Sequence, residues 1–301
     1  MSLTQDIRDA FARRDNTLNQ LIIINALVFT VIIIVRAILH VSQADGTYES
    51  IRRQLELSSS IPVLLRHPWT LLTYSFLHQD FFHILFNMLN MYWFGQIIRE
   101  YLGDRRLVSL YILGALAGAA FFLLAFNLLP VFQSGIGIPV LGASASVTAI
   151  IVATATLLPD YTFMLFIIGA VKIKWIALVV VLISIAGING GNPGGEITHL
   201  GGALLGFVFI KQLKAGRDIG TPVTAVGEWF GRVFSQKPGM RVTHRQPVTA
   251  TARSASSSAT TGSATLAAQD EIDLILDKIS RSGYESLSKD EKQKLFRASQ
   301  Q

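Results

Sequence analysis

The stretch Gly142-Ala143-Ser144-Ala145 leads directly into an apolar run from Ser146 to Leu158. Its small residues predict a turn that places Ser144 in the first turn of a membrane helix, where backbone N–H groups have no partner within the helix. These donors and the helix dipole favour negative charge, which suits an oxyanion that forms beside the serine hydroxyl. Taken alone, the pattern Gly-x-Ser more often marks close packing between two membrane helices. The remaining sequence decides between these two interpretations.

The composition indicates a membrane protein with several spans. Of the 301 residues, 50% are hydrophobic and 15% are charged, and the mean hydropathy is +0.44. Soluble globular proteins carry more charge, about 25% of their residues. The absence of cysteine excludes disulfides, thiolate catalysis and Cys-ligated metals. The net charge of +6 is explained by basic residues that flank membrane spans, so we expect no nucleic-acid partner. We also expect no cofactor and no metal ion.

The sequence predicts an all-α protein that crosses the membrane six times. The apolar segments that we assign as spans are residues 21–41, 81–98, 107–127, 144–158, 175–187 and 198–210. Basic residues follow the even-numbered spans, at Arg99, Arg105 and Arg106 and again at Lys211, Lys214 and Arg217. Because basic loops favour the cytoplasm, we expect a multi-pass protein of the cell membrane with both termini in the cytoplasm.

The connections between the spans differ in length and character. Residues 42–80 are too long for a simple loop between membrane helices and should contain structure of their own, with Trp69 and Tyr74 at the level of the lipid headgroups. Residues 161–174 are expected to be a cytoplasmic loop that lies against the membrane. The glycine-rich segment 188–196 is expected to be a flexible outer loop.

The domain organisation follows from shifts in composition. We expect a cytoplasmic segment over residues 1–20, a six-helix domain over 21–214 and an amphipathic membrane-surface segment over 215–244. Residues 245–269 are rich in Ser, Thr and Ala and predict a disordered linker. Residues 270–301 predict a small cytoplasmic helical hairpin, in which Gly283 ends the first helix and Ser288-x-x-Glu291 caps the second. No partner for this hairpin is indicated.

Polar residues fall within three of the predicted spans. His83 and Asn87 lie on the second span, Ser144 lies on the fourth, and His199 lies on the sixth. Such groups are costly in lipid and are functional candidates by default, although hydrogen bonding between helices explains a single asparagine or serine better. Two histidines, an asparagine and a serine at a helix start together favour a catalytic site.

These residue types suit a serine hydrolase. A serine hydroxyl needs a base to remove its proton, and His199 is the obvious base for Ser144. His83 and Asn87, one helical turn apart, can donate hydrogen bonds to an oxyanion. The glycines Gly201, Gly202 and Gly206 follow His199 on the same helix and allow the Ser144 helix to approach closely. No acid is obviously placed to orient His199, because Glu196 is expected to cap the helix, so we predict a Ser–His dyad.

The motifs His83-Ile-Leu-Phe-Asn87, Gly142-Ala-Ser144 and His199-x-Gly201-Gly202-x-x-x-Gly206 occur in this order on spans two, four and six. In this combination the chain resembles the rhomboid family of intramembrane serine proteases from about Leu21 to Lys214. The resemblance implies a six-helix bundle with a water-filled cavity that opens to the outer side. It also implies that Ser144 is the nucleophile, His199 the base, and His83 and Asn87 the oxyanion donors. The resemblance further implies that His78 is structural and that residues 188–196 cap the site.

Four positions depart from the family pattern. Ala145 follows the serine where many members have glycine, and Thr70 follows Trp69 where members have arginine. Arg99 stands where an acidic residue is frequent, and Thr148 stands where some members place an aromatic ring. Since none of these changes removes a predicted catalytic group, the resemblance still implies an active enzyme.

The sequence therefore predicts an intramembrane serine endopeptidase that uses Ser144 and His199. Its partners are expected to be the lipid bilayer and single-span membrane proteins with small or helix-breaking residues near the outer end of the span, because a helix keeps its amides hydrogen-bonded until it unwinds. The alternative is a catalytically inactive rhomboid-like protein that binds and escorts membrane helices. A transporter is disfavoured, since the spans contain neither internal repeats nor charged residues in the bundle.

Overall fold

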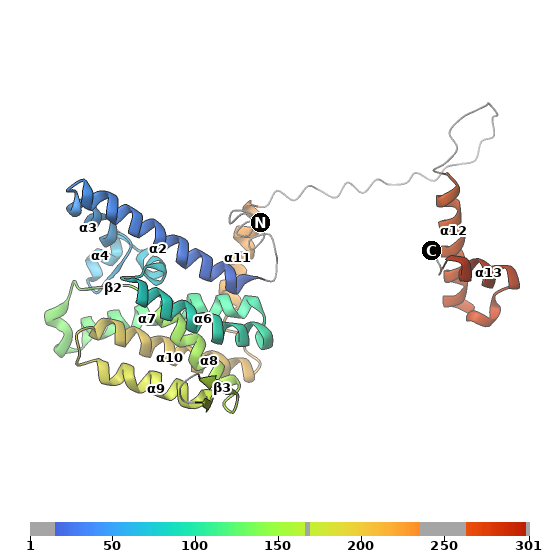
Figure 1. The fold of residues 1–301 in the computed structure, drawn as a ribbon. Coiled ribbons are helices and arrows are strands. Elements are labelled where there is room, and N and C mark those ends of the chain that lie inside the picture. The colour runs from blue at the N-terminus through green and yellow to red at the C-terminus, as the bar shows by residue number, and fades with distance from the viewer. Residues whose placement is uncertain (1–15, 166–168, 235–262, 299–301) are drawn as a thin grey trace. The chain divides into compact units, whose positions relative to one another are not determined.

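The computed structural model describes residues 16–165, 169–234 and 263–298 of the chain (Figure 1). The chain divides into two compact units, Met1–Lys237 and Pro238–Gln301, and each is described separately. Most of the expected N-terminal segment, residues 1–15, and most of the expected linker lie outside the described residues.

Six helices of the first unit correspond to the six predicted spans (Figure 1). They are α2 (Thr17–Val41), α6 (Phe81–Leu102), α7 (Asp104–Leu128), α8 (Ser144–Leu157), α9 (Ile173–Gly187) and α10 (Pro193–Lys214). By length and composition, α2 and α7 can each cross a membrane, whereas α8 and α9 are shorter apolar helices. The helices are thus observed, and their six crossings of a bilayer stay a prediction.

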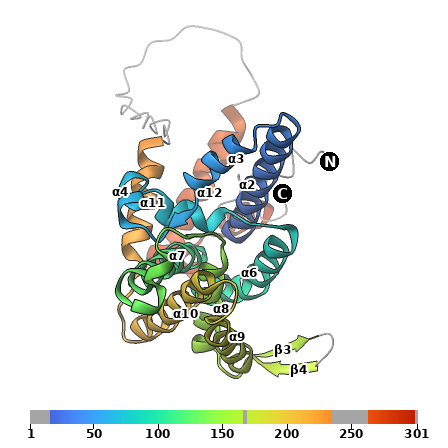
Figure 2. The same ribbon diagram turned by 90° about the vertical axis from the view of Figure 1, so that its left-hand side faces the viewer.

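The helix that carries Ser144 lies at the centre of this bundle. Helix α8 packs against α6, α7, α9 and α10, while α2 and α9 lie at opposite edges in Figures 1 and 2. Glycines allow the backbone of α10 to approach α8 closely. A Cβ on Gly202 or Gly206 of α10 would collide with the carbonyl groups of Ala145 and Ala149. The predicted close approach of the α8 and α10 backbones is therefore confirmed.

Glycines of α7 complete the close packing around α8. A Cβ on Gly114 would lie 2.8 Å from the Cβ of Ala149, and one on Gly118 would lie 2.6 Å from the Cβ of Ala145. Gly201 of α10 faces α7 instead, where a Cβ would lie 2.6 Å from the carbonyl oxygen of Ala117. Three helices with small facing residues can thus pack backbone to backbone, as in other membrane bundles.

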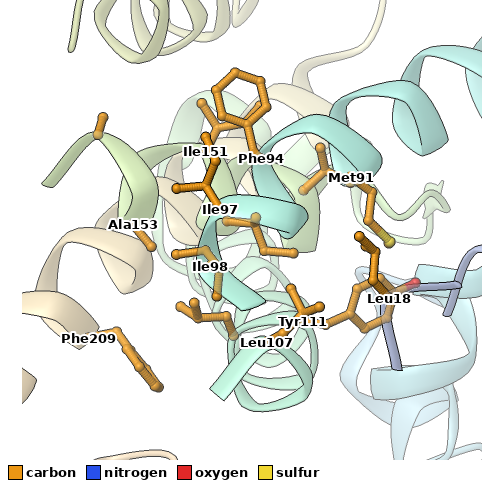
Figure 3. Close-up of a cluster of buried hydrophobic side chains, with 14 of the residues drawn as sticks. Leu18, Met91, Phe94, Ile97, Ile98, Leu107, Tyr111, Ile151, Ala153 and Phe209 are labelled. Carbon is orange, nitrogen blue, oxygen red and sulfur yellow. The ribbon is translucent and has the colours of Figure 1, made fainter. Parts of the chain in front are cut away.

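Larger side chains form a hydrophobic cluster beside this small-residue contact (Figure 3). The members labelled in Figure 3 are Leu18 of α2, Met91, Phe94, Ile97 and Ile98 of α6, Leu107 and Tyr111 of α7, Ile151 and Ala153 of α8, and Phe209 of α10. All are buried, and the cluster also includes Ile173 and Ala177 of α9, so it joins all six helices.

The long first connection contains structure of its own, as predicted. Its elements are α3 (Asp45–Arg53), β1 (Leu57–Ser58), α4 (Ile61–Arg66), α5 (Thr70–Thr73) and the 3-10 helix η1 (Tyr74–Phe76). Strand β1 pairs antiparallel with β2 (Pro139–Val140), which follows the 3-10 helix η2 (Pro130–Gly135). Tyr74 faces the protein interior: it is buried, and its hydroxyl donates to the carbonyl of Ala115 at 2.7 Å because a phenol in a core needs a partner. Its level relative to the lipid headgroups stays a prediction.

The connection between α8 and α9 corrects the all-α prediction. It contains an antiparallel hairpin of β3 (Thr162–Leu165) and β4 (Gly169–Lys172), visible at the end of α9 in Figure 2. Asp160 precedes the hairpin and accepts hydrogen bonds from Lys172 and Lys174, each at 2.9 Å. Hydrogen bonds from Lys174 and Lys172 lower the pKa of Asp160 to about 2. The protein is therefore mostly helical, with two small two-stranded sheets in its connections.

Helix α11 (Thr221–Phe234) forms the middle part of the predicted amphipathic segment, and residues 235–244 lie outside the described part of the chain. Two ion pairs tie it and its leading turn to α7: Arg106 with Asp218 at 2.8 Å, and Arg105 with Glu228 at 3.1 Å. Trp229 is about half exposed on this helix. Its position at a membrane surface stays a prediction.

The second unit contains the predicted helical hairpin, formed by α12 (Ser263–Ser282), the 3-10 helix η3 (Tyr284–Ser286) and α13 (Lys289–Ala298). Gly283 ends α12 with a φ of 76°, and the capping box is confirmed, since the Ser288 N–H donates to Glu291 at 2.7 Å and the Glu291 N–H donates to the Ser288 hydroxyl at 3.3 Å. Because α12 begins at Ser263, the linker prediction is wrong for residues 263–269.

Candidate active site

The four predicted site residues line one cavity of about 520 Å³. His83 and Asn87 reach it from α6, Ser144 from the start of α8, and His199 from the first half of α10. Apolar side chains form much of the remaining wall, among them Val147, Ile151, Val180 and Ile183. Residues that are more than a hundred positions apart in the sequence are thus brought to a common space.

Ser144 is the first residue of α8, and Gly142 shapes the space in front of it. Gly142 has a φ of 135°, and its N–H donates to the carbonyl of Tyr74 at 2.9 Å. A Cβ at this position would lie 2.9 Å from Nε2 of His83 and 3.4 Å from Oγ of Ser144. The missing side chain therefore leaves free volume next to both the imidazole and the hydroxyl.

The start of α6 positions the two predicted oxyanion donors. Asp80 caps the helix, since its Oδ1 accepts from the His83 N–H at 2.9 Å. The side-chain amide of Asn87 donates to the carbonyl of His83 at 2.9 Å, and an amide nitrogen carries a second N–H that can serve a ligand. His83 also packs edge to face against His78, with ring centroids 5.2 Å apart. His78 is buried, and within the described residues neither of its ring nitrogens has a hydrogen-bond partner.

The helix that carries His199 begins earlier than expected. Asn192 caps α10, because its Oδ1 accepts from the Gly195 N–H at 3.1 Å, and Pro193 is the first helical residue. The predicted outer loop 188–196 is therefore wrong over residues 193–196, which are helical. Proline is favoured at the first position of a helix, since it lacks the N–H that would have no partner there.

Glu196 lies beside the candidate base, although the sequence indicated no acid there. Nδ1 of His199 is 3.2 Å from Oε2 of Glu196 and 3.1 Å from Oγ of Ser184 on α9. The expected capping role of Glu196 is wrong, because Asn192 caps the helix. The spacing of three residues between Glu196 and His199 was the signal in the sequence, since residues at i and i+3 lie on one face of a helix.

The departures from the family pattern fit their surroundings. Ala145 is buried against the glycines of α7 and α10, so its methyl group is accommodated there. Thr70 is buried and donates to the carbonyl of His67 at 2.7 Å, while Thr148 is buried on the cavity wall. Arg99 lies in the last turn of α6, where a positive charge suits the helix dipole. Of these four residues, only Thr148 lines the cavity.

Two known protein families match most of the described chain. The model of the Rhomboid domain matches residues 65–214, and a family of unknown function (DUF6576) matches residues 263–301. The first match covers the cavity and five of the six bundle helices, and the second covers the helical hairpin.

Three curated relatives are similar to about half of this chain. RHOMBOID-like protein 12, mitochondrial, of Arabidopsis thaliana is 32% identical over 158 residues, which are 49% of this chain and 47% of that protein. Rhomboid protein 1, mitochondrial, of Saccharomyces cerevisiae is 29% identical over 52% of this chain and 45% of its own length. Rhomboid-like protein 16, chloroplastic, of Arabidopsis thaliana is 30% identical over 49% of this chain and 50% of its own length.

The chain thus spans about half the length of the curated relatives that it matches. The residues that the Rhomboid domain matches include Ser144, His199, His83 and Asn87, together with the glycines that bring α8 and α10 together. With the Rhomboid domain match over residues 65–214, these similarities show that the chain is a membrane protein of the rhomboid family.

Proposed function

We propose that this protein is a serine endopeptidase that cleaves peptide bonds within membrane-spanning segments. The observation that carries this proposal is the common cavity lined by Ser144, His199, His83 and Asn87. The rhomboid family includes intramembrane serine proteases, and these four residues are the groups that peptide hydrolysis requires: a nucleophile, a base and hydrogen-bond donors for an oxyanion.

In this mechanism Ser144 attacks the carbonyl carbon of the substrate while His199 accepts the hydroxyl proton at Nε2. The developing oxyanion receives hydrogen bonds from His83, from Asn87 and from the Ser144 N–H, which has no partner within α8 because it lies in the first turn. The tetrahedral intermediate then collapses, the C–N bond breaks, and His199 protonates the leaving amine. Water, activated by His199, hydrolyses the resulting acyl-enzyme and restores Ser144.

The proposed substrates are single-span membrane proteins that have small or helix-breaking residues near the cleaved bond. The carbonyl carbon of a regular helix is surrounded by its own turn, and its amides are hydrogen-bonded, so the segment must unwind before it enters the site. A cavity of about 520 Å³ with apolar walls accommodates a short extended segment with small side chains. The lipid bilayer is the second partner, as solvent for the bundle.

The proposed arrangement places six crossings in a cell membrane with both termini in the cytoplasm. It rests on the basic residues that follow α6 and α10, since such residues favour the cytoplasmic side. Helix α8, with 14 residues, is about 21 Å long, which is shorter than the ~30 Å hydrocarbon core of a bilayer. In this arrangement Ser144 lies below the outer surface, at the depth of a spanning substrate.

The alternative is a rhomboid-like protein that binds and escorts membrane helices without cleaving them. An escort protein needs a groove for a helix but no nucleophile or base. The presence of both Ser144 and His199 on the wall of one cavity favours the enzyme, because binding a helix requires neither a nucleophile nor a base.

The test is cleavage of tagged single-span proteins by the purified full chain in liposomes. We expect Ser144→Ala and His199→Ala each to abolish cleavage, because the nucleophile and the base act as one unit and losing either costs nearly as much as losing both. A fluorophosphonate probe should label the wild type at Ser144. As a matched control, Ser50→Ala changes an exposed serine of α3 and should leave cleavage and labelling unchanged.

Two outcomes would separate the candidates. Cleavage by Ser144→Ala at the wild-type rate would refute the proposed mechanism. Capture of spanning segments by the wild type, with neither cleavage nor labelling of Ser144, would support the escort protein instead.

A further inference from the structure

We infer that Glu196 is a positioning residue for His199, so that the catalytic unit is a Glu–His–Ser relay in which Ser184 of α9 supports the contact. This inference rests on the proposed protease function. It assigns to Glu196 the task of holding the base in one tautomer and one orientation, and of stabilising the imidazolium that forms when Ser144 gives up its proton.

The contact between the two side chains selects the tautomer of His199. Oε2 of Glu196 lies 3.2 Å from Nδ1, and an ionised carboxylate can only accept a hydrogen bond. Nδ1 must therefore carry the proton, which leaves the lone pair on Nε2 for the hydroxyl of Ser144. With Nδ1 protonated, the Ser184 hydroxyl, 3.1 Å from the same nitrogen, can only accept a share of that proton, which leaves its own O–H free to donate to Glu196.

Helices α9 and α10 together accommodate the carboxylate of Glu196. Gly187 is the last residue of α9, and a Cβ there would lie 2.9 Å from Cδ and 3.0 Å from Oε1 of Glu196. The side chain of Glu196 therefore rests on a bare backbone that no other residue type would offer. Glu196 also lies in the first turn of α10, where the helix dipole favours a negative charge.

The degree of burial makes this ion pair effective during the reaction. The side chains of His199 and Glu196 are 24% and 22% exposed, so solvent screens their interaction less than it screens a surface pair. Among the described residues, the other titratable groups on the cavity wall are Asp80 and His83, from the start of α6. Glu196 is the carboxylate that contacts the imidazole, and its removal should change the pH dependence of the base directly.

The experiment measures fluorophosphonate labelling and substrate cleavage between about pH 5 and 9 with the full chain in liposomes. In Glu196→Gln we expect kcat and the labelling rate to fall at least about 10-fold, with KM unchanged, because the new amide can donate to Nδ1 and favours the wrong tautomer. The acidic limb of the pH profile should move to lower pH, because the imidazolium loses the carboxylate that stabilises it. Glu196→Asp keeps the charge and should restore part of the rate and the wild-type acidic limb.

A second variant tests the same contact without changing the carboxylate. Gly187→Ala should displace the Glu196 side chain and produce the same shift of the acidic limb, whereas it should add nothing when combined with Glu196→Gln. Gly46→Ala is the matched control, because a Cβ at Gly46 of α3 meets no atom within 4 Å. Should Glu196→Gln fail to fold, the Gly187→Ala variant still decides the question.

The outcomes distinguish the inference from the function on which it rests. A wild type that neither cleaves nor labels refutes the protease, and with it the relay. A wild type that cleaves, together with Glu196→Gln and Gly187→Ala variants that keep its rate and pH profile, refutes the relay alone and leaves a Ser–His dyad.

Discussion

Helices α8 and α2 are both apolar in sequence, but they occupy opposite kinds of position in the bundle. Helix α8 is short, is surrounded by four other helices, and has most of its residues buried. Helix α2 has 25 residues, of which only Leu18, Leu21, Asn25 and Phe29 are buried. Exposed positions of α2 include Leu27, Val31, Ile33, Ile34 and Ile38. An apolar surface of this extent suits lipid rather than water.

The size of the side chains explains the difference between the two helices. Helix α8 contains mainly Ala, Ser, Thr and small β-branched residues, and these allow neighbouring backbones to approach it closely. Helix α2 contains a long series of Ile, Leu and Val residues, which keep neighbours at a distance and interact well with lipid tails. Hydropathy alone therefore locates both helices, whereas side-chain size decides which one becomes the centre.

The strongest test of this comparison is to enlarge a residue at the contact of α8 with α10. We expect Gly202→Val to destabilise the protein by more than about 3 kcal/mol or to prevent folding, because its side chain would collide with the carbonyl of Ala145 and neither backbone can move aside. Thermal unfolding and gel filtration in detergent measure the effect.

Gly231→Ala in α11 is the control for Gly202→Val, since a Cβ there meets nothing within 4 Å. It should be neutral or stabilise α11 by up to about 1 kcal/mol, because alanine is the better helix former. A Gly202→Val protein that unfolds at the wild-type temperature would show that α8 and α10 do not depend on this contact.

The turn that leads into α8 gives a second test, in which activity and folding separate. Gly142→Ala and Gly137→Ala both place a side chain at a positive φ, which costs roughly 1–2 kcal/mol in each case. Only the methyl group at position 142 meets His83 and Ser144, while the one at 137 meets nothing within 4 Å. We therefore expect Gly142→Ala to lose phosphonate labelling and Gly137→Ala to keep it. Equal labelling of the two variants would show that the free volume beside His83 and Ser144 is not needed for the reaction of Ser144.

Helix α6 lies between α2 and α8. Substitutions on its polar face test whether that face serves catalysis or packing. We expect His83→Ala and Asn87→Ala to lower kcat more than they raise KM, by up to about 100-fold, which corresponds to about 3 kcal/mol of transition-state stabilisation. The effect of one change can be smaller, because the other side chain and the Ser144 N–H still donate. Normal turnover by both variants in detergent would identify these side chains as packing groups between helices.

Substitutions on the buried and the exposed surface of α2 should differ sharply in their effect on stability. Leu18 is fully buried, with Cδ1 2.8 Å from the position of a Cβ on Gly95 of α6, so Leu18→Ala should cost about 2–5 kcal/mol of unfolding free energy. Val31 is 56% exposed, and Val31→Ala should change the unfolding free energy by less than about 0.5 kcal/mol. Thermal unfolding in one detergent compares them directly. Equal destabilisation by both changes would mean that α2 packs against other protein segments along its whole length.

The smallest effect is expected from a region that belongs to neither helix. Removal of residues 245–301 eliminates the hairpin of α12 and α13 but none of the groups that line the cavity. The kcat and KM for a tagged single-span substrate should therefore remain those of the full chain. A truncated protein that inserts and is stable but does not cleave would assign a direct part in the reaction to the hairpin.

The sequence predicted the parts of this protein that follow from local pattern. Runs of apolar residues located all six bundle helices to within a few residues at most ends, because a helix in lipid must satisfy its own backbone hydrogen bonds and depends little on its neighbours for length. The capping box of Ser288 and Glu291 was predictable for the same reason, since its hydrogen bonds join residues three positions apart. The four cavity residues were predictable because polar groups in apolar runs are rare and costly.

Contacts between distant segments were decided only by the tertiary structure. The burial of Tyr74 depends on a carbonyl of α7, and the orientation of Gly201 toward α7 but of Gly202 toward α8 depends on how three helices pack. The place of Glu196 was misjudged, because it is set by Gly187 and Ser184 of α9 together with the cap at Asn192. By itself the sequence determined which helices form and which polar residues they carry. Packing decided which of these groups meet, since side-chain contacts between helices depend on size and rotation that no local pattern records.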